Sequence, residues 1–123
     1  MNVAPFAWPL IGVIGAAGAL LRVGIDGAVE RRTSQRFPFG TLAVNLSGAA
    51  VLGLVHGLGA GGSTGLLVGT AGLGSYTTFS TLMFESERLL EEDDRVPAAA
   101  NIVGSILLGL GVVALGWVAG RAL

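Results

Sequence analysis

The chain has 123 residues, of which 52% are hydrophobic and only 12% are charged, and its mean hydropathy is +0.75. A formal net charge of −1 excludes a basic nucleic-acid surface, and the absence of cysteine excludes disulfides and thiolate metal sites. No Ser/His/Asp set, cluster of metal ligands or phosphate-binding loop is evident, which argues against an enzyme. The composition predicts a single domain, residues 1–123, embedded in a lipid bilayer.

Four apolar stretches follow one another along the chain. They cover about residues 8–25, 39–58, 65–84 and 97–118. Each is close to the roughly 20 residues that an α-helix needs to cross a bilayer. Because backbone groups must be hydrogen-bonded internally in lipid, we expect helices rather than open strands. The predicted fold class is an all-α integral membrane protein with four transmembrane helices.

The arginines predict the orientation of these spans. Five lie between spans one and two or between spans three and four, and only one lies on the other side. The five are Arg31, Arg32, Arg36, Arg88 and Arg95, and the single one is Arg121. The positive-inside rule then predicts a multi-pass protein of the cell membrane with both charged loops in the cytoplasm and both termini outside.

The first span is rich in small residues and carries one charged side chain late in its length. Its stretch GVIGAAGA allows a neighbouring helix to approach closely, within one subunit or between subunits. Arg22 has two interpretations, and the sequence leaves both open. Either it reaches the interface or pairs with Asp26 one turn further on, or it supplies positive charge to the vestibule of an anion pathway.

The second and fourth spans each contain an asparagine, and the fourth also has a nearby serine. Asn45 lies near the middle of span two, and its amide offers two donors. In span four, Asn101 and Ser105 are one turn apart and share a face. Each of these groups either makes a hydrogen bond between helices or binds an anion in place of water.

The third span contains the unusually polar stretch GLGSYTTFSTLMFE, residues 72–85. Glycine is a poor helix former, and Ser and Thr compete for backbone hydrogen bonds, so this pattern predicts a helix broken in mid-span. Carbonyls exposed at a break suit a small cation, and a second half-helix would begin with Phe79, Ser80 and Thr81. The competing interpretation is a continuous, glycine-kinked helix whose hydroxyls bond to their own turn.

Two of these stretches carry a family resemblance. GTLAVNLSG (40–48) together with GLGSYTTFST (72–81) resembles the Fluc (CrcB) family of fluoride channels. The resemblance covers nearly the whole chain, since GAAGALLR, ending on Arg22, and NIVGS (101–105) fall in family order. It implies four-helix subunits in an antiparallel dimer with two narrow pores, through which fluoride leaves the cell passively.

The resemblance also implies roles for individual residues. The backbone carbonyls of Gly74 and Thr77 would bind a structural sodium ion that is not transported. Arg22 would lie in the vestibule. The residues that would line the fluoride pore are Asn45, Phe79, Ser80, Thr81 and Ser105.

The sequence departs from the family pattern, GG followed by [LF]TTFSTF. Ser75 replaces the second glycine, and Leu82 replaces the last phenylalanine, so the second pore ring is missing from this subunit. Together with the uneven arginines, this predicts a heterodimer with a homologous subunit of opposite orientation, although a dimer with itself stays open. Leu82 also leaves open the alternative of a non-conducting assembly subunit. No Asp or Glu lies at mid-span, which argues against another alternative, a small multidrug-type exporter.

Overall fold

The computed structural model describes residues 4–33 and 36–123, and in this part of the chain all regular structure is helical. The long helices are α1 (Ala7–Glu30), α2 (Phe39–Gly57) and α6 (Arg95–Ala122). Between α2 and α6 lies a series of shorter elements, which we call the third segment. It consists of α3 (Gly62–Thr64), the π-helix η1 (Gly65–Leu73), α4 (Gly74–Tyr76) and α5 (Ser80–Glu91).

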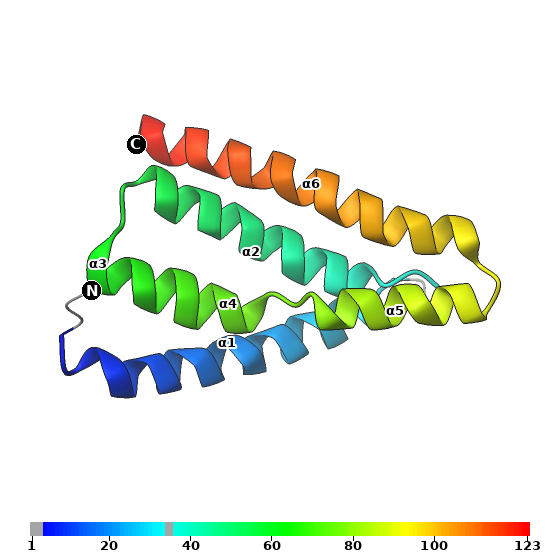
Figure 1. Ribbon diagram of the computed structural model, residues 1–123, viewed down its shortest axis with the longest axis horizontal. Helices are drawn as coiled ribbons and strands as arrows, with labels where there is room; N and C mark the ends of the chain where they lie inside the picture. Colours follow the sequence, from blue (N-terminus) through cyan, green and yellow to red (C-terminus); the bar gives the residue numbers. More distant parts are fainter. Residues whose placement is uncertain (1–3, 34–35) are drawn as a thin grey trace.

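The three long helices and the third segment alternate in direction, so that α1 begins at the same end of the molecule at which α6 finishes (Figure 1). By length and composition, α1, α2 and α6 could each cross a membrane. The prediction of an all-α chain with long apolar helices is therefore confirmed. The third predicted span, 65–84, is not one helix but a succession of short ones.

Large apolar side chains on the long helices point outward instead of into a core. Leu20 on α1 is 74% exposed and Leu115 on α6 is 71% exposed. In a water-soluble protein such a surface would be unfavourable, whereas lipid chains solvate it. The buried apolar set is correspondingly small, and its largest members are Tyr76, Leu82 and Leu89. The exposed apolar surface agrees with the multi-pass membrane protein that the composition predicted.

Glycines bring α2 and α6 into backbone contact. A Cβ atom added at Gly53 would overlap the Val113 carbonyl, and one added at Gly116 would lie 3.0 Å from the Leu54 nitrogen. Such close approach is typical of helix pairs in lipid, where apolar burial gives little attraction and backbone packing replaces it. The small residues of these helices therefore pack the subunit internally.

Helix α1 packs against the third segment in the same way. A Cβ atom at Gly18 would lie 2.6 Å from the Gly72 carbonyl oxygen and 2.5 Å from the Ser75 hydroxyl. Helix α2 thus has α6 on one side and α1 with the third segment on the other. This arrangement places the middle of α2 directly beside the polar stretch of the third segment.

Candidate functional site

The helix of the third segment is interrupted at residues 77–79, which we call the break. Helix α4 ends at Tyr76, α5 starts at Ser80, and Thr77 is extended, with φ −76° and ψ 158°. The predicted break in the helix is confirmed, and the competing continuous helix is wrong. The break nevertheless lies after the glycines rather than at them, since Gly74 and Ser75 are still helical.

Hydroxyl groups explain why the helix persists through GLGS. The Ser75 hydroxyl donates to the Ala71 carbonyl at 2.6 Å and contacts the Gly72 carbonyl at 3.0 Å. The Thr77 hydroxyl donates to the Leu73 carbonyl at 2.9 Å. These hydroxyls bond back to carbonyls of the preceding turn, and the Thr77 backbone N–H also donates to the Leu73 carbonyl at 2.9 Å. The expectation of back-bonded hydroxyls was thus correct, but they finish the first half-helix instead of keeping the helix continuous.

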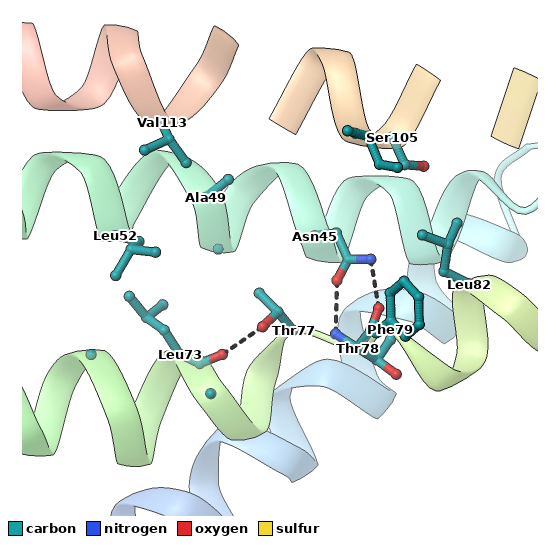
Figure 2. Close-up of a pocket in the computed structure, with 14 residues that line it drawn as sticks. Asn45, Ala49, Leu52, Leu73, Thr77, Thr78, Phe79, Leu82, Ser105 and Val113 are labelled. Atoms are coloured by element: carbon teal, nitrogen blue, oxygen red, sulfur yellow. Dashed lines mark hydrogen bonds between the residues drawn. The ribbon is translucent and has the colours of Figure 1, made fainter. Parts of the chain in front are cut away.

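Asn45 holds the break from α2. Its Oδ1 accepts the backbone N–H of Thr78 at 2.8 Å, and its Nδ2 donates to the Thr78 carbonyl at 2.8 Å (Figure 2). The amide therefore replaces both helical hydrogen bonds that Thr78 gives up. Of the two interpretations of Asn45, the bond between helices is confirmed. One Nδ2 hydrogen is left over, so binding of an anion stays a prediction.

Thr78 in turn caps the second half-helix. Its Oγ1 accepts the backbone N–H of Thr81 at 3.2 Å and lies 3.1 Å from the Thr81 hydroxyl. This bond satisfies one of the free N–H groups at the start of α5, as a helix N-cap does. The Ser80 hydroxyl lies 3.4 Å from Thr78 Oγ1, at the edge of hydrogen-bond range, and Ser80 is exposed. One side chain at the break thus sets where α5 begins.

A groove of about 370 Å³ runs along the break between α2, the third segment and α6. It brings together several of the residues predicted from the sequence. Those that line it are Asn45, Gly74, Thr77, Phe79 and Ser105, with Leu82 beside them. The Ser105 hydroxyl is buried and has no hydrogen-bond partner among the described residues. Among the described residues that line the groove, none is charged.

The remaining predicted residues lie apart from this groove. Arg22 and Thr81 line a second, smaller cavity of about 180 Å³ together with Asp26 and Thr41. Within the described ranges Arg22 and Asp26 form no salt bridge, although both line this cavity. Asp26 Oδ1 is buried and has no hydrogen-bond partner there. The structure therefore separates the predicted pore residues into two sets. Thr78, which lines both cavities, is the point where they meet.

The break also leaves backbone carbonyls available. The Thr78 N–H, which would bond to the Gly74 carbonyl in a continuous helix, is directed to Asn45 instead. The Thr77 carbonyl belongs to an extended residue, outside any helical ladder. Both Gly74 and Thr77 line the groove. Within the described ranges, no group of three or more His, Asp or Glu side chains could hold a metal ion.

Asn101 belongs to a separate hydrogen-bonded network between α5 and α6. It is 1% exposed, and its Nδ2 donates to the Ser86 hydroxyl at 2.9 Å, while Ser86 donates to the Leu82 carbonyl at 2.7 Å. The bond between helices is thus confirmed for Asn101. Ser86 was not predicted from the sequence, because its only signal is its position one turn after Leu82.

Long apolar helices around a broken helical segment, with a largely apolar groove at the break whose few polar groups are uncharged, define the class as a multi-pass membrane protein. The family model described as CrcB-like protein, Camphor Resistance (CrcB), matches residues 9–117. The chain therefore belongs to the CrcB-like family.

Similar proteins extend over most of the chain. A protein of Mycolicibacterium paratuberculosis named fluoride-specific ion channel FluC 2 is 54% identical over 102 residues, which cover 83% of this chain and 84% of that protein. The FluC 2 of Mycobacterium tuberculosis is 48% identical, covering 91% of this chain and 90% of its own length. The fluoride-specific ion channel FluC 1 of Frankia casuarinae is 40% identical over 94% of this chain and 96% of its own length. The chain thus resembles these relatives over nearly their whole length.

Proposed function

We propose that this chain is a subunit of a fluoride-specific channel that lets fluoride leave the cell passively. The observation that carries the proposal is the groove at the break, whose polar lining consists of uncharged groups only. Fluoride is small and tightly hydrated, so a selective pathway must replace its water with fixed donors. The spare Asn45 N–H, the unpaired Ser105 hydroxyl and the edge of the Phe79 ring are donors of this kind. Relatives named as fluoride-specific channels support the assignment.

The second cavity serves as the vestibule of this pathway. Arg22 supplies a positive charge there, beside the carboxyl group of Asp26, and Thr81 supplies a hydroxyl. Thr78 connects the vestibule to the groove, because it lines both. Ser80, on the exposed first turn of α5, continues the row of hydroxyls. Positive charge at the entrance attracts an anion, and the uncharged narrow part then selects it by its hydration.

A structural sodium ion at the break completes the proposal. The carbonyls of Gly74 and Thr77 would hold it, and their freedom from the helical ladder fits hard oxygen ligands. Two carbonyls are fewer than hard cations take in proteins, so a second subunit would supply a matching set. The ion would stabilise the contact between subunits and would not be transported.

The partner in this arrangement is an antiparallel subunit, with the third segment crossing the membrane as a fourth, broken span. Phe79 is 69% exposed in the isolated subunit, although it lines the groove. A second subunit packed over the groove would cover it. Because Leu82 supplies no ring and the arginines lie mostly at one side, we favour a homologous partner of opposite orientation over a second copy. The same arginine bias places both termini outside the cell membrane.

The proposal is tested with liposomes loaded with potassium fluoride, in which a fluoride electrode records efflux. One sample contains the purified chain alone, and another contains it with a homologous subunit of opposite arginine bias. We expect selective fluoride efflux from the second sample and little from the first. No fluoride efflux from either sample would contradict the channel, whereas strong efflux from the chain alone would contradict the heterodimer.

The second candidate function is a non-conducting assembly subunit, which Leu82 favours because it lines the groove where a ring would be needed. Phe79→Ile in this chain, with the partner unchanged, separates the two candidates. A conducting subunit loses much of the fluoride efflux of the pair. Unchanged efflux would favour the assembly role. A Leu82→Phe variant that conducts on its own would show that the missing ring is what silences this chain.

A further inference from the structure

Helix α2 contacts the end of α4 through a second hydrogen-bonded pair. The hydroxyls of Ser47 and Tyr76 lie 2.8 Å apart, and Ser47 donates to the Val44 carbonyl at 3.0 Å. A serine hydroxyl has a single hydrogen, so when it bonds to Val44 the Tyr76 O–H donates to Ser47. The Tyr76 side chain is buried, with 7% of the residue exposed. Its hydroxyl therefore has one specific acceptor, supplied by α2.

This pair lies outside the groove. Ser47 and Tyr76 line a largely apolar cavity of about 420 Å³ between α1, α2 and the third segment, and neither is among the residues that line the groove. Asn45, in contrast, lines the groove and bonds to Thr78. A substitution at Ser47 or Tyr76 thus replaces no residue that lines the groove.

The two bonds from α2 fall on either side of Thr77. Asn45 fixes Thr78, and Ser47 fixes Tyr76. Between them, Gly48 provides the surface on which the break rests: a Cβ atom there would lie 3.2 Å from Tyr76 Cδ1 and would overlap the Thr77 side chain. Thr77 is therefore held extended because both of its neighbours are tied to one helix.

We propose that Tyr76 and Ser47 are positioning residues that set the affinity of the cation site formed by the Gly74 and Thr77 carbonyls. The inference rests on the proposed function, and it assigns to this chain a device that controls sodium binding. Tyr76 lies between Gly74 and Thr77, so rotation at Tyr76 changes the position of one carbonyl relative to the other. Ligands held in place before binding lose less freedom when the ion arrives, which raises affinity.

The test uses Tyr76→Phe, which removes one oxygen atom and keeps the ring. The full chain is purified in detergent in the assembly it forms, and its melting temperature is followed as sodium chloride replaces N-methylglucamine chloride at constant ionic strength. We expect the sodium concentration at half-maximal stabilisation to rise about fivefold, as loss of one hydrogen bond predicts. Ser47→Ala is expected to raise the sodium midpoint by the same factor, and the double variant to raise it little further. Ser47→Thr, which keeps the hydroxyl, is expected to keep the wild-type midpoint.

Ser86→Ala is the matched control, because it removes a buried hydroxyl from the α5–α6 network and leaves the break untouched. It lowers the melting temperature without moving the sodium midpoint. An unchanged midpoint in Tyr76→Phe, or an equal shift in Ser86→Ala, overturns the inference.

Fluoride efflux of the same preparations keeps this inference apart from the proposed function. A wild-type assembly that conducts fluoride but ignores sodium overturns the cation site and its positioning residues, while the channel stands. A sodium shift in Tyr76→Phe without fluoride efflux from the wild type upholds the positioning role and contradicts the channel.

Discussion

Helix α2 is held to its two neighbours by opposite means. Toward α6 it presents Gly53, and the contacts there are between backbones. Toward the third segment it presents Asn45 and Ser47, and the contacts are hydrogen bonds from side chains. Backbone packing is tight, but it depends only on the shapes of the two helices. The hydrogen bonds instead select one conformation of one short stretch, residues 77–79. Stability and positioning are thus divided between two faces of the same helix.

The α5–α6 contact shows that side-chain hydrogen bonds also hold the other side of the groove. Asn101 and Ser86 fix α5 through the Leu82 carbonyl, so that Leu82 and Ser105 line the groove together. The half-helix after the break is therefore held by α2 at its start and by α6 one turn later. Its residues keep a fixed place although the segment has no continuous helix to support it.

The largest effect is expected where a polar side chain supports the backbone of the break. Asn45→Leu leaves the N–H and the carbonyl of Thr78 unpaired, and each unpaired group costs about 1–3 kcal/mol. We expect a loss of about 2–6 kcal/mol in the free energy of unfolding, together with the loss of fluoride efflux. Chemical unfolding in detergent and liposome efflux measure the two effects.

Asn45→Asp is the companion variant, because it keeps an acceptor for the Thr78 N–H and loses the donor. It is expected to recover part of the stability and none of the efflux. Wild-type stability in Asn45→Leu would contradict the view that this amide holds the break.

The second-largest effect is expected at the glycines that bring α2 and α6 into backbone contact. Gly116→Val places a side chain against the backbone of α2, 3.0 Å from the Leu54 nitrogen, where neither helix can yield without moving. Overpacking of this kind costs about 1–3 kcal/mol, and we expect a lower melting temperature in proportion. Gly111→Val on the same helix is the control, since nothing lies within 4 Å of its added Cβ atom. Equal melting of the two variants would mean that α2 and α6 are not in backbone contact.

The smallest effect is expected at Gly48, where the two kinds of contact come together. An added Cβ atom would meet the side chains of Tyr76 and Thr77 instead of backbone. Because side chains can shift, Gly48→Ala is expected to cost about 1 kcal/mol or less. Fluoride efflux, which depends on the position of Thr77, should fall further than stability does. A stability loss as large as that of Gly116→Val would contradict the distinction between the α2 face that packs on α6 and the α2 face that contacts the third segment.

Much of this arrangement could be predicted from the sequence, because it depends on local pattern. The spans follow from runs of apolar residues, and the break follows from glycines and hydroxyls in 72–85. The place of the break could not be predicted so well. It lies at 77–79 because Asn45, 33 residues earlier, takes over the hydrogen bonds of Thr78. Contacts between residues so far apart leave no periodic signal in one sequence.

The candidate site was predicted in the same uneven way. The resemblance selected Asn45, Phe79 and Ser105 together, and the structure places them on one groove. The Ser47–Tyr76 bond went unpredicted, because a serine two residues from Asn45 lies on another face of the helix, and only the fold shows what it meets there. The separation of Arg22 and Thr81 into a second cavity likewise depends on how α1 packs.

The central claim is that fluoride passes through the groove at the break. The most direct test compares fluoride and chloride efflux from liposomes that contain the subunit pair, with and without Asn45→Leu in this chain. The account predicts that fluoride leaves the wild-type liposomes while chloride stays, and that the variant abolishes the fluoride flux through the groove of this subunit. Equal efflux of the two anions, or wild-type fluoride efflux in the variant, would contradict it.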